Sequence, residues 1–185
     1  MGKGKKKKTT TGKFVKEFSA GGVVYRKRKT ENSKLKTLWL VTRSTPSKLY
    51  PKSIWRLPKG WLDDKDKGKK PGNLALGKIK ATDEQIKTAA IREVEEEAGV
   101  KAKIIEKIGS ERYFLTLNGK RILKFVTFYL MEWLEDNKEG FSFETCEVKW
   151  LSYEEAKKLL SYGSEKKILD KGREILESRI QETLV

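Results

Sequence analysis

The sequence predicts an α/β or α+β fold built on a mixed sheet. Short runs rich in β-branched and aromatic residues alternate with three segments of helical periodicity, and their order fits strands and helices that pack in layers. The length of 185 residues suits a single domain. A hydrophobic share of 37%, with five Trp, six Tyr and seven Phe, is enough for a packed core.

The composition excludes several classes of protein. The chain has no histidine, which rules out Ser-His-Asp and Cys-His catalysis and His-containing zinc sites, so a general base must be a carboxylate, Lys or Tyr. Its single cysteine, Cys146, fits a reducing compartment, and we expect a cytoplasmic protein. No apolar stretch reaches the roughly 18 residues of a membrane span, so we expect no membrane partner. Nothing in the sequence points to an oligomeric state.

The N-terminal half begins with a basic segment. Residues 1–13 hold six lysines and predict a disordered arm, which places the single domain at 14–182. Strands are predicted at 18–26, 37–44 and 53–60. Residues 63–81, with Gly, Pro and six lysines, predict a long flexible loop.

The C-terminal half contains the helices. A capping box of Thr82 and Gln85 predicts a helix that runs to about Ala98 and stops at Gly99. Two long strands are predicted at 103–116 and 121–133, and a short strand at 147–152. A helix at 152–160, which Gly163 ends, and a last amphipathic helix at 164–180 complete the prediction.

The stretch REVEEEAGV, Arg92 to Val100, places four glutamates within five positions of a chain with a net charge of +16. On a helix Glu93 and Glu97 fall within the apolar arc and Glu96 at its edge, whereas Glu95 points away. Crowded, buried carboxylates must be paired, protonated or bound to cations. Mg²⁺ prefers carboxylate oxygens together with substrate phosphates, so the patch predicts a metal site. The surplus of lysine and arginine predicts polyanionic partners such as nucleotides, nucleic acid or inositol phosphates.

The same residues resemble the signature of Nudix hydrolases. Glu84 is followed by seven residues and then by the fixed positions Arg92, Glu93, Val94, Glu96, Glu97, Gly99 and Val100. The signature glycine would fall at Lys78. Its counterpart is Gly60 in LPKGWLDD, and this alignment requires an insertion of about 18 residues, which segment 63–81 supplies. The resemblance covers roughly 16–180 and implies a Nudix fold, a mixed sheet sandwiched between helices.

The resemblance also implies roles for individual residues. Glu93, Glu96 and Glu97, with the backbone carbonyl of Lys59, would ligate Mg²⁺ or Mn²⁺, and a carboxylate, Glu93 or Glu96, would help activate water. Gly60, Glu84, Arg92 and Gly99 occupy the structural positions of the motif. Among them, Arg92 and Glu84 match a pair that braces the loop around the helix.

Weaker similarities concern the substrate. Segments 18–26, 55–61 and 111–131 resemble diadenosine polyphosphate and diphosphoinositol polyphosphate hydrolases. The candidates for phosphate contacts are Arg43, Lys59 and Lys124. Tyr113 or Phe114 could stack a base. Glu144 or Glu147 could approach the site from the opposite side.

The leading hypothesis is therefore a hydrolase that cleaves a pyrophosphate bond in a nucleoside diphosphate linked to another moiety, with a (di)nucleoside polyphosphate as substrate. One alternative is nucleotide-pool cleansing or removal of a 5′ pyrophosphate from RNA. A second is a non-catalytic module that binds RNA or another anion. The intact glutamate set argues against that module, whereas the lysines within residues 3–8 would favour nonspecific contact with nucleic acid.

Overall fold

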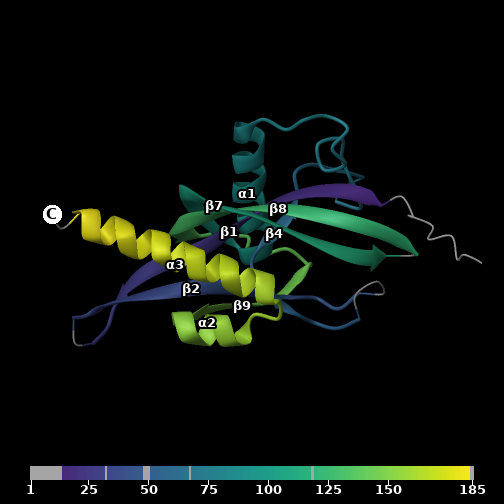
Figure 1. Ribbon diagram of the computed structural model, residues 1–185. Coiled ribbons are helices and arrows are strands. Elements are labelled where there is room, and N and C mark those ends of the chain that lie inside the picture. The colour runs from purple at the N-terminus through teal and green to yellow at the C-terminus, as the bar shows by residue number, and fades with distance from the viewer. Residues whose placement is uncertain (1–13, 32, 48–50, 67, 118, 184–185) are drawn as a thin grey trace, which may run out of the picture.

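The computed structural model describes residues 14–183 except 32, 48–50, 67 and 118. The arm predicted at 1–13 lies outside the described residues. The elements, in chain order, are β1 (Val15–Lys29), β2 (Leu35–Ser44), β3 (Trp55–Arg56), β4 (Lys59–Trp61), β5 (Asp64–Lys65), β6 (Lys70–Pro71), α1 (Asp83–Ala98), β7 (Val100–Leu117), β8 (Lys120–Asp136), β9 (Thr145–Leu151), α2 (Tyr153–Leu159) and α3 (Gly163–Thr183) (Figure 1).

The main sheet is mixed, as the sequence predicts. Its hydrogen-bonded order is β3-β2-β1-β8-β7, with β4 paired to β1 and β9 to β2. Strand β1 pairs in parallel with β8 from Val15 to Tyr25 and antiparallel with β2 along its last five residues. At Ser19–Gly21 it also pairs with β4. This central position of β1 brings β4 and β8, which are distant in sequence, to the same part of the sheet.

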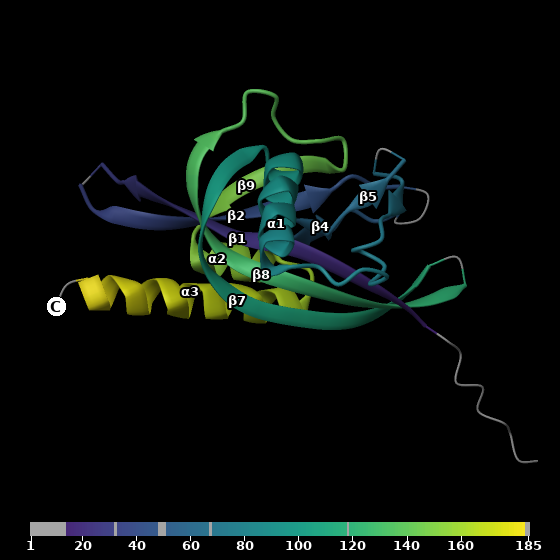
Figure 2. The same ribbon diagram turned by 90° about the horizontal axis from the view of Figure 1, so that it is seen from above.

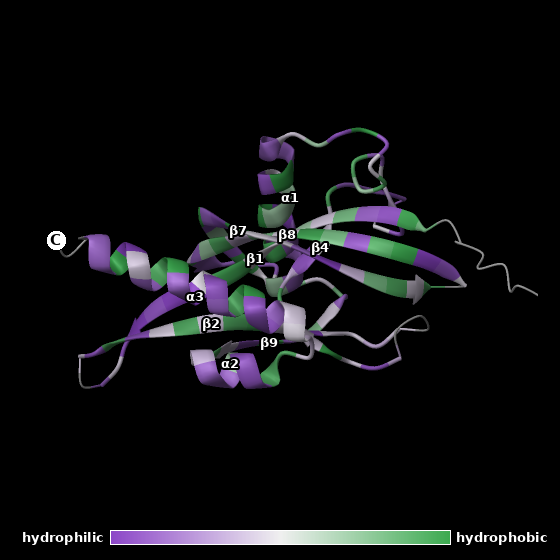
Figure 3. Ribbon diagram, in the orientation of Figure 1, coloured by the Kyte–Doolittle hydropathy of each residue, from purple (hydrophilic) through white to green (hydrophobic). Residues whose placement is uncertain are grey.

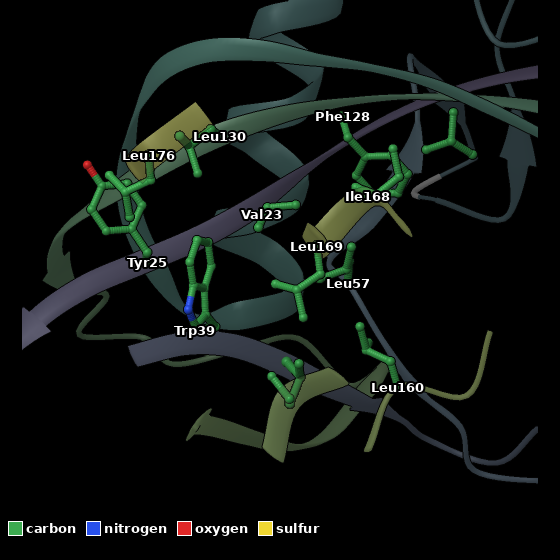
Figure 4. Close-up of a cluster of buried hydrophobic side chains, with 13 residues drawn as sticks. Val23, Tyr25, Trp39, Leu57, Phe128, Leu130, Leu160, Ile168, Leu169 and Leu176 are labelled. Carbon is green, nitrogen blue, oxygen red and sulfur yellow. The ribbon is translucent and has the colours of Figure 1, made fainter. Parts of the chain in front are cut away.

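Helices cover both faces of the sheet, with α1 on one side and α2 and α3 on the other (Figures 1 and 2). Because side chains alternate along a strand, β1 serves both layers. Val23 and Tyr25 pack in the cluster beneath α3 (Figure 4), whereas Ala20 and Val24 pack against α1. Figure 3 shows bands of apolar and hydrophilic residues along the strands of the sheet.

Helix α1 has the predicted ends. The Thr82 hydroxyl accepts a hydrogen bond from the Gln85 N–H at 3.2 Å, and Gln85 Oε1 accepts one from the Thr82 N–H at 2.9 Å. Gly99 ends the helix with φ of 65°, and its N–H donates to the Glu95 carbonyl at 3.0 Å. These caps fix which residues of α1 face the sheet.

The insertion at 63–81 is more ordered than the predicted long loop. It contains the β5–β6 hairpin, which lies to one side of α1 (Figure 2). The Asp63 carboxylate accepts the N–H groups of Leu74 and Ala75 at 3.2 and 2.7 Å, and the Ala75 carbonyl accepts the Phe18 N–H at 2.7 Å. These bonds anchor the insertion to β1, an interaction that loop composition does not reveal.

Two other features complete the fold. Gly163 begins α3 rather than ending α2, which stops at Leu159. Within the part of the chain that the structure describes, no helix is both long and apolar enough to cross a membrane.

The C-terminal cap of α1 gives a matched test. Gly99 and Gly119 both have positive φ, but only at Gly99 would a Cβ meet other atoms, at 2.7 Å from the Gly140 carbonyl carbon. Gly119→Ala should cost about 1–2 kcal/mol of unfolding free energy from backbone strain alone. Gly99→Ala should cost at least about 1 kcal/mol more because of overpacking. Urea denaturation measures both, and equal losses would contradict this account of the cap.

Candidate active site

Two carboxylates of α1 are buried against the sheet. Glu93 is 7% exposed and Glu97 3%, while the side chain of Glu96 is 51% exposed. Glu93 and Glu97 are one turn apart and therefore share a face of the helix. The helical geometry thus predicted their burial correctly.

Glu97 connects α1 to the segment between β3 and β4. Its Oε1 accepts a short, charged hydrogen bond from Arg56 Nη2, and its Oε2 accepts the Lys59 N–H at 2.8 Å. Burial raises the pKa of the Glu97 carboxyl, and the charges of Arg56 and Lys59 act in the opposite direction. The arginine therefore neutralises a carboxylate that would otherwise be too costly to bury.

Glu93 lies beside Gly60 and Arg92. Arg92 Nη2 is 2.8 Å from Glu93 Oε1 and also donates to the Trp61 carbonyl at 2.8 Å. Burial raises the pKa of Glu93 to about 8, with further contributions from the negative charges of Glu97 and Glu96, although Arg92 opposes the shift. A Cβ at Gly60 would lie 2.0 Å from Glu93 Oε2, so only glycine leaves room for this carboxylate.

Arg92 and Glu84, the residues expected to brace the loop around the helix, do not pair with one another. Glu84 is eight residues before Arg92, about 12 Å along the helix axis, and its side chain is 80% exposed and paired with Lys87 at 2.8 Å. Arg92 instead binds Glu93 and, at 2.9 Å, Glu96. It also lies 3.9 Å from Asp64 in the insertion. The insertion thus brings a different carboxylate toward this arginine.

A cationic surface adjoins the carboxylates. The register of β1 and β8 places Lys124 opposite Glu17, whose carboxylate accepts the indole N–H of Trp61 at 2.9 Å. Lys124 Nζ is 5.8 Å from the centre of the Trp61 ring. Burial and the positive charges of Lys59 and Arg56 lower the pKa of Lys124 to about 8, although Glu17 opposes them. An arriving anion would relieve this crowding of positive charge.

Lys59 is placed differently from the expected phosphate contact. Its Nζ is 2.8 Å from Glu165 Oε1, and both side chains are buried. Its ammonium is thus turned toward α3 in this structure. Only the backbone of Lys59 meets the α1 carboxylates, through the bond to Glu97.

The structure separates the remaining candidates. Glu147 pairs with Arg43 at 3.0 Å, so these two neutralise one another. The charge of Glu144 raises the pKa values of Glu97 and Arg56, which places Glu144 near the site.

The two aromatic candidates, Tyr113 and Phe114, point to opposite faces of the sheet. Tyr113 packs against the cluster beneath α3, and its charge when ionised raises the pKa of Arg56. Phe114 is exposed and contacts Phe14 edge-on at 5.9 Å. Only Tyr113 therefore shares a face with Lys124 and Glu17.

Four residues of this region are absent from the sequence-based set. Arg56 and Trp61 flank the Pro-Lys-Gly turn, so their proximity to the motif was a usable signal. Glu17 and Glu165 meet the site only through the sheet register and the placement of α3, and no local pattern marks them.

The carboxylates have the donor chemistry for a hard divalent cation but are engaged by arginines. Within the described parts of the chain, no three acidic, His or Cys side chains converge as a ready metal site. The oxygen donors of Glu93, Glu96 and Glu97 nevertheless suit Mg²⁺ or Mn²⁺. A cation would compete for them with Arg92 and Arg56.

The sequence matches the NUDIX domain family over residues 16–171. The chain belongs to the Nudix family. Nudix hydrolases act on acid anhydrides in phosphorus-containing compounds and generally use divalent metal ions.

Individual proteins that are similar to this chain support the same family assignment. An Ap4A hydrolase from C. elegans, solved as a binary complex, is 27% identical and superimposes with a TM-score of 0.58, covering 88% of this chain and 98% of its own. The MutT protein of Methanosarcina mazei Go1 shares the fold at 17% identity and a TM-score of 0.54, over 89% of this chain and 97% of its own. A Mycobacterium tuberculosis (strain CDC 1551 / Oshkosh) protein that bears the name MutT4 is 30% identical over 108 residues, which span 58% of this chain but only 36% of that relative.

The ion pairs predict different stabilities for two similar substitutions. Without added metal, Glu97→Gln should lower the unfolding free energy by about 3 kcal/mol, because it leaves Arg56 without a counter-charge in a buried site. Glu96→Gln breaks only an exposed pair and should cost less than about 1 kcal/mol. Urea denaturation in EDTA measures both. Equal losses would show that Arg56 does not stabilise Glu97.

The lowered pKa of Lys124 predicts a pH dependence. Its folded pKa of about 8 lies below the ordinary 10.5. The unfolded chain thus holds more protons in this window, and the contribution of Lys124 to stability grows as pH rises from 8 to 10.5 and is lost as pH falls. Relative to Lys124→Met, the wild type should gain stability between pH 7.5 and 10. A stability difference that stays constant over this range would contradict the assignment.

Proposed function

We propose that this Nudix hydrolase is a metal-dependent enzyme that cleaves dinucleoside polyphosphates such as diadenosine tetraphosphate. The observation that carries the proposal is the juxtaposition of buried carboxylates, Glu93 and Glu97, with a crowded cationic surface at Lys124 and Arg56. The similarity to the C. elegans Ap4A hydrolase, which extends over nearly the whole of that chain, supports this substrate class.

Mg²⁺ or Mn²⁺ would be held by Glu93, Glu96, Glu97 and the carbonyl of Lys59. When bound, the cation would supply charge neutralisation at the pyrophosphate and a water of lowered pKa. Arg92 and Arg56, which pair with these carboxylates in the structure, would then be able to face the phosphates of the substrate. The two guanidinium groups would then pair with the phosphates rather than with the glutamates.

A carboxylate would remove the proton of the attacking water. Glu93 and Glu96 are the candidates. Burial raises the pKa of Glu93 to about 8, and a group that titrates near the working pH exchanges protons readily. Glu144, in the loop between β8 and β9, lies near Glu97.

Lys124 and Tyr113 would bind the substrate away from the cleaved bond. A phosphate beside Lys124 would favour the charged ammonium that Lys59 and Arg56 now disfavour. Tyr113 offers a ring on the same face of the sheet for an adenine base. A polyphosphate chain suits this arrangement because it presents several negative charges in a row to several separate cations.

A substrate panel tests the proposal. Diadenosine tetraphosphate, nucleoside triphosphates and 5′-triphosphorylated RNA are compared in Mg²⁺ by phosphate release after phosphatase coupling. We expect the highest kcat/KM on the dinucleotide and no turnover in excess EDTA. Glu97→Gln should lower kcat by about 100-fold or more, whereas Glu95→Gln, whose carboxylate points away from this face, serves as the matched control.

Two results would overturn the proposal: full activity in EDTA, or a preference for triphosphorylated RNA. A chain that lacks residues 1–12, included in the same panel, tests the proposed nonspecific nucleic-acid contact through the lysines of residues 3–8. It should hydrolyse the dinucleotide like the full chain and bind RNA more weakly.

A further inference from the structure

Glu165, in the first turn of α3, is a buried acidic residue. It is 4% exposed and lies far from α1 in the sequence. Its Oε2 accepts the N–H of Leu57 at 2.8 Å, and its Oε1 pairs with the Lys59 ammonium at 2.8 Å. Both oxygens of one carboxylate are therefore directed at the same three-residue turn, Leu57–Lys59.

The opposite end of that turn is held by a second carboxylate. The Lys59 N–H donates to Glu97 Oε2 at 2.8 Å. The turn is therefore bonded to α3 on one side of the sheet and to α1 on the other. Pro58, between them, has no N–H to satisfy. Its carbonyl accepts the Gly22 N–H at 3.1 Å, which ties the centre of the turn to β1. Every backbone N–H of the turn thus has a carboxylate partner.

The burial of Glu165 requires this arrangement. An isolated buried carboxylate is strongly unfavourable, and so is an isolated buried ammonium. Glu165 and Lys59 can be buried together because each satisfies the other, and the Leu57 N–H adds a further bond. Since the contacts are reciprocal, a change at Glu165 alters the turn rather than α3 alone.

We propose that Glu165 is a positioning residue that sets the Leu57–Lys59 turn, and through it Glu97, for metal binding. It contacts neither metal nor substrate. It fixes the Lys59 backbone, whose N–H holds Glu97 and whose carbonyl is a proposed ligand. The metal part of this inference rests on the proposed function.

The first measurement is the Mg²⁺ concentration that gives half of the metal-induced rise in Tm. Glu165→Gln keeps an oxygen for the Leu57 N–H but leaves the Lys59 ammonium unpaired. Glu165→Asp keeps the charge but is too short to reach both partners. Each should raise this concentration about tenfold, the usual effect of losing a group that orients a metal ligand. Leu169 is a fully buried residue of α3 in the cluster beneath that helix. Leu169→Ala therefore controls for loss of stability, and it should change the Mg²⁺ concentration by less than about twofold.

The second measurement needs no metal. The Lys59 amide should exchange its hydrogen about tenfold faster in both Glu165 variants, relative to the buried Leu40 amide of β2, and at an unchanged relative rate in Leu169→Ala. The proposal is overturned if both Glu165 variants match the wild type, or if Leu169→Ala shifts the same quantities equally. If the wild type shows no response to Mg²⁺, the proposed function fails, and the exchange of the Lys59 amide alone decides the role of Glu165.

Discussion

The carboxylate of Glu97 is the constraint on which the arrangement of the site depends. It is buried between α1 and the sheet, where a bare charge would be prohibitively costly, and it is stabilised there by Arg56 and the Lys59 N–H. These two bonds join the helix of the Nudix motif to the turn before β4. The turn also positions Gly60. Because glycine has no side chain, the Glu93 carboxylate can occupy the space beside it.

The pairing of buried carboxylates with cations recurs elsewhere in the molecule. The chain carries a surplus of 16 positive charges, yet three of its buried carboxylates, those of Glu97, Glu93 and Glu165, are matched individually by Arg56, Arg92 and Lys59. At Lys124, burial and the charges of Lys59 and Arg56 hold the pKa of the lysine down, although Glu17 opposes them. A metal ion would suit the paired carboxylates of this site, and a polyphosphate would suit the cations beside them.

Much of this could be predicted from the sequence because it depends on local periodicity. The capping box of Thr82, the stop at Gly99 and the burial of Glu93 and Glu97 all follow from the geometry of one helix. The residues that pair with these carboxylates and with Lys59 could not be predicted in the same way. Arg56 reaches Glu97 through tertiary packing, and Glu165 reaches Lys59 across more than a hundred residues. The motif alone also does not show that Arg92 lies near Asp64 of the insertion, or that Glu84 pairs with Lys87.

A double-mutant cycle between Arg56 and Glu97 tests the central claim most directly. The unfolding free energies of the wild type, Arg56→Met, Glu97→Gln and the double variant are measured in EDTA and again in saturating Mg²⁺. The account predicts a favourable coupling of at least about 1.5 kcal/mol in EDTA, the range seen for residues in contact. This coupling should shrink in Mg²⁺ as the metal takes the place of the arginine. A coupling near zero in EDTA, or one that Mg²⁺ leaves unchanged, would contradict it.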